Sequence, residues 1–152
     1  MDHAKNRTDD LASWSADLPL HGKLTYLGDQ EKPVPSVFFH SVGMTAGYEI
    51  FIPHQSKSVR YSNDTVGNAR HFIFTRQEQA AILGNLAPIM PGDATPNPRW
   101  ALVMVQPSPS GSRSIEWFLN DTLARQIVDA ITRALAPENQ LGKRILSQVP
   151  LV

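Results

Sequence analysis

The side chains that could carry chemistry are few and widely spaced in this sequence. It has five histidines and no cysteine, which excludes a disulfide, a thiolate nucleophile and any cysteine-based metal site. The zinc motif H-E-x-x-H, the nucleophile motif G-x-S-x-G and the glycine-rich phosphate loops do not occur. We therefore predict no metal and no cofactor, although histidines and carboxylates from separate strands could still assemble a metal site.

One set of three residues has the order of a catalytic site. His21-Gly22 stands on an expected first strand, Tyr48 on a later strand and Glu116 on one of the last. This order resembles the His–Tyr–Glu order of the ADP-ribosyltransferases, and Ser56-Lys57-Ser58 followed by Tyr61 is similar to that fold as well. The resemblance implies that His21 and Tyr48 bind NAD and that Glu116 orients the ribose for attack. The other interpretation of Glu116 is a solvent-facing residue on its strand.

A basic stretch with interleaved aromatic residues is the candidate for a partner-binding surface. Between residues 57 and 76 there are four Lys or Arg side chains and one acidic residue. Tyr and Arg are the usual anchors of protein–protein interfaces, whereas the interpretation without function is a solvated sheet edge. We expect Phe51 and Trp100 to be exposed aromatic residues. The residues predicted to contact a partner are Phe51, His54, Lys57, Arg60, Tyr61, Arg70 and Trp100.

Composition and charge exclude several function classes. The chain has 152 residues, with 14 Lys plus Arg and 14 Asp plus Glu, so its formal net charge is zero. Nonspecific nucleic-acid binding needs a basic excess, which is absent here. The first residues are polar, and no apolar run approaches the roughly 18 residues that span a bilayer. We therefore expect a cytoplasmic protein that binds neither nucleic acid nor membrane.

Alternating apolar and polar residues predict strands along most of the chain. Residues 99–106 are apolar on both faces, as in a central strand. The proline- and serine-rich run 107–112 predicts a hairpin connection to the next strand. The expected strands are residues 23–28, 36–43, 47–53, 58–61, 70–74, 99–106 and 113–119.

Two helices have clear start signals. Thr75 and Glu78 fit a capping box, and a helix from there would bury Ile82, Leu83 and Leu86. Asn120 or Asp121 caps a second helix, which Pro137 closes. Its apolar stripe repeats every four residues and consists of Leu123, Ile127, Ile131 and Leu135.

A further short helix is expected to begin at Thr8 or Asp9 and run to about Ala16, with Leu11 and Trp14 on one face. The tail, residues 138–152, is too apolar to hang free, so we expect it to pack on its own domain or on a partner.

These elements predict an α+β fold: a mostly antiparallel sheet of about five to seven strands with two main helices on one face, in the order α-βββ(ββ)-α-ββ-α. Residues 1–10 are expected to be flexible and residues 11–152 to form a single domain. The element order resembles that of class I type III secretion chaperones. Members of that family are small cytosolic dimers that hold an N-terminal segment of an effector.

The small size, the absence of catalytic motifs and the apolar tail favour a non-catalytic protein-binding module. The specific forms are a bacterial immunity or inhibitor protein that binds a toxin, or a secretion-chaperone-like protein that binds an effector, and either could be a homodimer. The alternative is a small transferase that uses His21, Tyr48 and Glu116. A small-molecule binding module is a third hypothesis.

Overall fold

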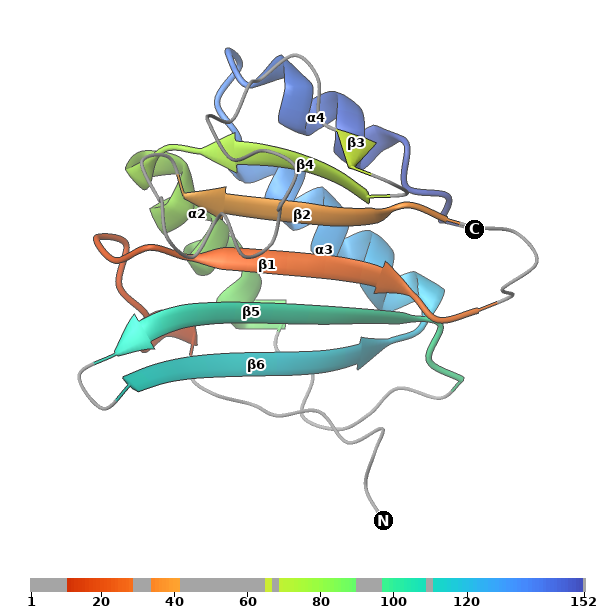
Figure 1. Ribbon diagram of the computed structural model, residues 1–152, viewed down its shortest axis with the longest axis horizontal. Coiled ribbons are helices and arrows are strands. Elements are labelled where there is room, and N and C mark those ends of the chain that lie inside the picture. Colours follow the sequence, from red (N-terminus) through yellow and green to blue (C-terminus); the bar gives the residue numbers. More distant parts are fainter. Residues whose placement is uncertain are drawn as a thin grey trace.

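A single mixed sheet forms the framework of the protein (Figure 1). The computed structural model describes residues 11–28, 34–41, 65–66, 69–89, 97–108 and 111–151. The strand order across the sheet is β3-β4-β2-β1-β5-β6. The strands are β1 His21–Tyr26, β2 Ser36–Ser41, β3 Thr65–Val66, β4 Ala69–Phe74, β5 Trp100–Ser108 and β6 Gly111–Leu119.

All neighbouring strands in this order run antiparallel except β2 and β4, which run parallel. The prediction of an α+β fold with a mostly antiparallel sheet is thus confirmed. The parallel pair has a consequence for function, because the N-terminal ends of β2 and β4 lie at the same end of the sheet. Val37 is opposite Arg70 there.

In the view of Figure 1, α2 and α3 lie behind the sheet, and α4 lies along β4 at the top. The helices are α2 Arg76–Leu86, α3 Asp121–Ala134 and α4 Gln140–Ser147, with 3-10 turns η1 Leu11–Ser13 and η2 Ala87–Ile89. None of the helices in the described ranges is long and apolar enough to cross a membrane.

The helix starts follow from side chains that accept from free backbone N–H groups. The Thr75 side chain accepts from the Glu78 amide, and the Glu78 carboxylate accepts from the Thr75 amide at 2.8 Å. This is the predicted capping box. Asn120 caps α3 by accepting from the Leu123 amide at 2.9 Å, and Asn139 caps α4 in the same way.

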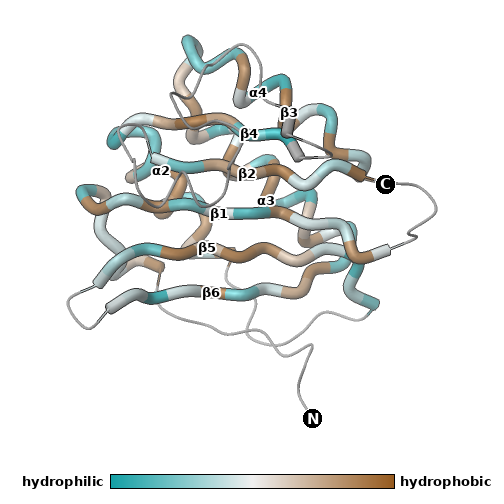
Figure 2. Tube along the Cα trace, viewed as in Figure 1, coloured by the Kyte–Doolittle hydropathy of each residue, from teal (hydrophilic) through white to brown (hydrophobic). Residues whose placement is uncertain are grey.

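The core lies between the helices and the face of the sheet that they cover. β5 is hydrophobic over much of its length and lies between β1 and β6 (Figure 2). The buried stripe of α2 is as predicted, with Ile82, Leu83 and Leu86 at most 5% exposed. The largest fully buried side chains are Trp100, Trp117, Phe39, Phe72 and Phe74.

Two local predictions differ from the structure. Within residues 11–16 there is only the 3-10 turn η1 in place of a helix, although Leu11 and Trp14 are buried as expected. The apolar tail contains α4, which was not predicted. It packs on β4 and α3 of the same chain, through Ile145 and Leu146.

The contact between α4 and the rest of the core depends on Gly142. A Cβ atom at this position would stand 2.7 Å from a Leu135 methyl carbon and 2.9 Å from the Phe72 ring. Such distances are too short for carbon atoms, so α4 approaches the core this closely only because residue 142 has no side chain.

We expect Gly142→Ala to lower the free energy of unfolding by about 1–3 kcal/mol, since overpacking forces the neighbours to move. The matched control is Gly84→Ala, because Gly84 is exposed inside α2 and a Cβ there meets nothing within 4 Å. That change should raise stability by about 0.5–1 kcal/mol through helix propensity. Urea unfolding of both variants measures these changes. An unchanged free energy of unfolding in Gly142→Ala would contradict the close packing at this position.

Candidate functional site

Five of the predicted partner-binding residues, Phe51, His54, Lys57, Arg60 and Tyr61, lie outside the described residues. Arg70 is the second residue of β4, and Trp100 is the first residue of β5. Only these two can therefore be placed.

The prediction that Trp100 is exposed and contacts a partner is wrong as to exposure, because the residue is buried. Its side chain is 1% exposed, and its indole Nε1 donates to Asp121 Oδ1 at 2.9 Å. The reason is register, because Trp100 is opposite Tyr26 and Leu119 on the two neighbouring strands. It therefore points to the side of the sheet that the helices cover. Its ring packs against that of Tyr26, with centroids 5.0 Å apart.

Two members of the alternative catalytic set, His21 and Glu116, lie on the same face of the sheet. His21 is opposite Val105, which is opposite Ser114, and Glu116 is two residues further along β6. β5 lies between them, so their backbones are about 12 Å apart from standard strand spacings. Glu116 is exposed, and Tyr48 lies outside the described residues.

The face that carries His21 also carries His40 and His71, on adjacent strands. His40 and His71 are 3% and 1% exposed, and their rings are 6.4 Å apart. Burial lowers the pKa of His40 to about 3; a hydrogen bond with the Ser41 carbonyl opposes this, and His71 and His21 add to it. Burial lowers the pKa of His71 to about 4 and also lowers that of His21. All three are neutral at pH 7.

In the described ranges no group of three His, Cys, Asp or Glu side chains is placed to hold a metal ion.

Arg70 lines a groove at the end of the sheet where β2 and β4 begin. One wall comes from the residues that enter β2, another from the last turn of α4 and the segment that follows it. The groove has a volume of about 250 Å³. Its lining residues are Val34, Pro35, Val37, Arg70, Ile145, Gln148, Val149 and Pro150.

Among the described residues of this lining, Arg70 carries the one charged group. Its Nε atom is buried and has no hydrogen-bond partner among the described residues. A buried donor without a partner costs about 1–3 kcal/mol, and a hydrogen bond to a charged acceptor recovers a similar amount. The groove thus combines apolar walls with a guanidinium whose Nε has no acceptor among the described residues.

The size of the groove limits what it can accept. Small-molecule and cofactor sites usually have volumes of about 300–1,000 Å³, whereas 250 Å³ holds one or two side chains. The arrangement suits a short apolar segment that brings one negatively charged group to Arg70.

A second cavity, of about 440 Å³, lies where α2 begins, and its buried carboxylate, Glu78, is already engaged. Glu78 Oε2 accepts from the Ala136 amide at 2.7 Å and from the Asn139 side chain at 3.2 Å. The other carboxylate oxygen belongs to the capping box. Glu78 therefore joins the start of α2 to the connection between α3 and α4, and we assign it a structural role.

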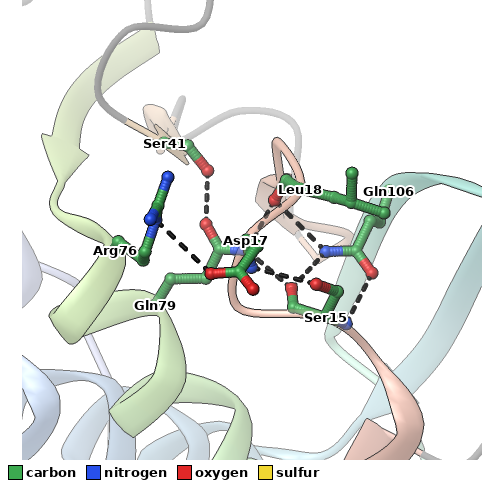
Figure 3. Close-up of polar contacts among 7 residues, drawn as sticks. All are labelled: Ser15, Asp17, Leu18, Ser41, Arg76, Gln79 and Gln106. Atoms are coloured by element: carbon green, nitrogen blue, oxygen red, sulfur yellow. Dashed lines mark hydrogen bonds and ion pairs between the residues drawn. The ribbon is translucent and has the colours of Figure 1, made fainter.

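Two buried glutamines hold the segment before β1 against the sheet (Figure 3). Gln79 and Gln106 are 1% and 0% exposed. Each side-chain amide donates to the carbonyl oxygens of both Ser15 and Leu18. Gln106 also accepts from the Ser15 amide at 3.0 Å, and Ser41 Oγ donates to the Gln79 side chain at 2.5 Å. This cluster, the glutamine clasp, satisfies backbone groups and leaves no polar group for a ligand.

No family model matches the chain, and no curated protein or solved structure matches it significantly.

The sequence predicts Arg70 as a partner-binding residue but not the groove that it lines. The signal for Arg70 was local: a basic stretch with interleaved aromatic residues. The lining, in contrast, comes from residues 34–37, 70 and 145–150, which only the parallel pairing of β2 with β4 and the docking of α4 bring together. A signal for α4 exists in Asn139, a good N-cap residue, followed by Leu141 and Ile145 four residues apart.

Proposed function

We propose that this chain is a non-catalytic protein-binding module, and that the groove at Arg70 takes part in binding. The observation that supports this proposal is the combination found there: apolar walls, a volume suited to side chains and a guanidinium whose Nε has no acceptor among the described residues. Apolar contacts around an Arg anchor are typical of the energetic centre of an interface.

The more specific forms of the proposal are an immunity or inhibitor protein that blocks a toxin, and a secretion-chaperone-like protein that holds an effector. Both functions need a stable scaffold and a surface that receives a segment of another protein. The element order predicted from the sequence favours the chaperone-like form, and a homodimer fits either form.

Co-purification from the native cells tests the proposal. We expect one protein to remain bound to the tagged full-length chain in a fixed ratio and, once purified, to bind it with a Kd in the micromolar range or below. A matched bait in which Gln148 is replaced by tryptophan fills the groove from an exposed position and should recover less of this protein.

Two results would contradict the proposal. One is the absence of any stoichiometric partner under conditions in which the chain stays folded. The other is turnover of NAD by the purified chain that is lost in His21→Ala and Glu116→Ala, because this would support the alternative transferase hypothesis.

A further inference from the structure

We infer that the groove at Arg70 recognises an acidic side chain, Asp or Glu, flanked by apolar residues in an internal segment of the partner protein. This inference rests on the proposed function and adds the chemistry of the partner. Three features of the groove lead to it: its charge, the nature of its walls and the two prolines in its lining.

Arg70 supplies the charge and is the one charged residue in the part of the lining that the structure describes. A guanidinium presents a planar fork of donors that matches a carboxylate, and Nε is part of that fork. Arg70 as a residue is only partly buried, so its guanidinium can meet a carboxylate in the groove. Nε itself is buried, so a carboxylate reaches it only after a small shift of the Arg70 side chain, and no described residue accepts from Nε in competition. Charge complementarity therefore selects an anionic group.

The walls determine what surrounds that anionic group. Val34, Val37, Ile145 and Val149 supply aliphatic carbons, and of the described lining residues Gln148 alone has an uncharged polar side chain. Apolar walls favour apolar neighbours of the carboxylate, because these exclude water and strengthen the charged hydrogen bond. A phosphate group, which needs several donors, would find a single guanidinium.

The two prolines of the described lining favour a side-chain carboxylate over the C-terminal carboxylate of a partner. Sites that capture a chain terminus use clustered backbone N–H groups. Two of the eight lining residues, Pro35 and Pro150, have no N–H group. An acidic side chain reaches Arg70 through its own methylene groups and does not depend on such a cluster.

A peptide selection tests the inference. A library of random nine-residue peptides, displayed as internal segments, is selected on the full-length chain. We expect enrichment of Asp or Glu next to Leu, Ile, Val or Phe. The best peptide is then synthesised with both ends capped, together with its acid-to-amide variant, and both are titrated against the wild type, Arg70→Gln and Arg144→Gln.

The wild type should bind the acidic peptide about 10- to 150-fold more tightly than its amide variant, the range expected for a hydrogen bond to a charged group. Arg70→Gln should bind both peptides equally weakly. Arg70→Lys should fall between, because it keeps the charge and loses the fork. Arg144→Gln, which changes an exposed cation of α4 outside the lining, should behave as the wild type.

The peptide arm uses only the wild-type chain, so it decides the matter even if an Arg70 variant fails to fold. Equal affinity of the wild type for the two peptides overturns the acidic anchor and leaves the proposed function in place. Selection of no peptide overturns the groove as a docking site. Absence of a native partner in the co-purification is a separate result, and it contradicts the proposed function itself.

Discussion

Replacement of both Gln79 and Gln106 by leucine is expected to lower the free energy of unfolding by about 3–5 kcal/mol, a large part of the 5–15 kcal/mol of a typical domain. The two amide groups donate to the same pair of carbonyl oxygens, those of Ser15 and Leu18. Either glutamine alone still supplies each carbonyl with one donor. Only the double variant leaves both carbonyls without these donors.

The glutamine clasp therefore predicts non-additive effects. Each single variant should lose about 1–2 kcal/mol. Gln106→Leu also removes the acceptor of the Ser15 amide, and Gln79→Leu also removes an acceptor of the Ser41 hydroxyl. The double variant should exceed the sum of the two, by an amount in the usual range of about 0.5–3 kcal/mol for coupled neighbours.

Guanidinium unfolding followed by tryptophan fluorescence measures these changes, with Gln126→Leu on the exposed side of α3 as the control. The control should stay within about 0.5 kcal/mol of the wild type. Additive single effects would show that the two glutamines act independently, contrary to the shared acceptors in Figure 3.

A fall in pH from 7 to 5 is expected to remove about 4 kcal/mol of stability through His40 and His71. Burial lowers their pKa values to about 3 and about 4, from the ordinary value of 6.5. Below pH 6.5 the unfolded chain binds protons that the folded chain does not bind, so folding becomes less favourable as pH falls. Each such histidine contributes about 1.4 kcal/mol per pH unit in this window.

The change is continuous down to the folded-state pKa values and is absent above pH 7. His21, whose pKa is also lowered by burial, changes stability in the same direction. Among the described residues, the other charged side chain on this face of β1 is Lys23, and Glu116 lies two strands away.

Urea unfolding at pH 7, 6 and 5 tests this prediction on the wild type, His40→Gln, His71→Gln and the double variant. The slope of stability against pH is compared rather than stability itself, because the substitutions also change packing. Each single variant should lose roughly half of the slope. An unchanged slope in the double variant would assign the acid sensitivity to other groups.

The parts of the fold that follow from short-range patterns were predicted well. The Thr75 capping box and the Asn120 cap depend on residues three positions apart, so both can be recognised from the sequence alone. The buried residues of β6, Ile115, Trp117 and Leu119, alternate as an antiparallel strand with one covered face requires.

The parts that depend on distant pairing were not predicted. Trp100 follows a proline-rich loop, which suggested exposure, yet its position opposite Tyr26 and Leu119 buries it. α4 has only eight residues, so its stability comes from packing on β4 and from the absence of a side chain at Gly142. The groove could not be predicted from the sequence for the same reason, because two of its walls form only when α4 docks and β2 pairs with β4.

The most direct test of the central claim is the Kd of the purified native partner for Gln148→Trp, measured by isothermal titration calorimetry. Gln148 is exposed and lines the groove, so an indole there should fill the space without disturbing the core. We predict a Kd at least about 10-fold higher than that of the wild type. The matched variant Gln126→Trp, on the exposed side of α3, should bind as the wild type does. Unchanged affinity of Gln148→Trp would contradict the assignment of the groove as the partner-binding site.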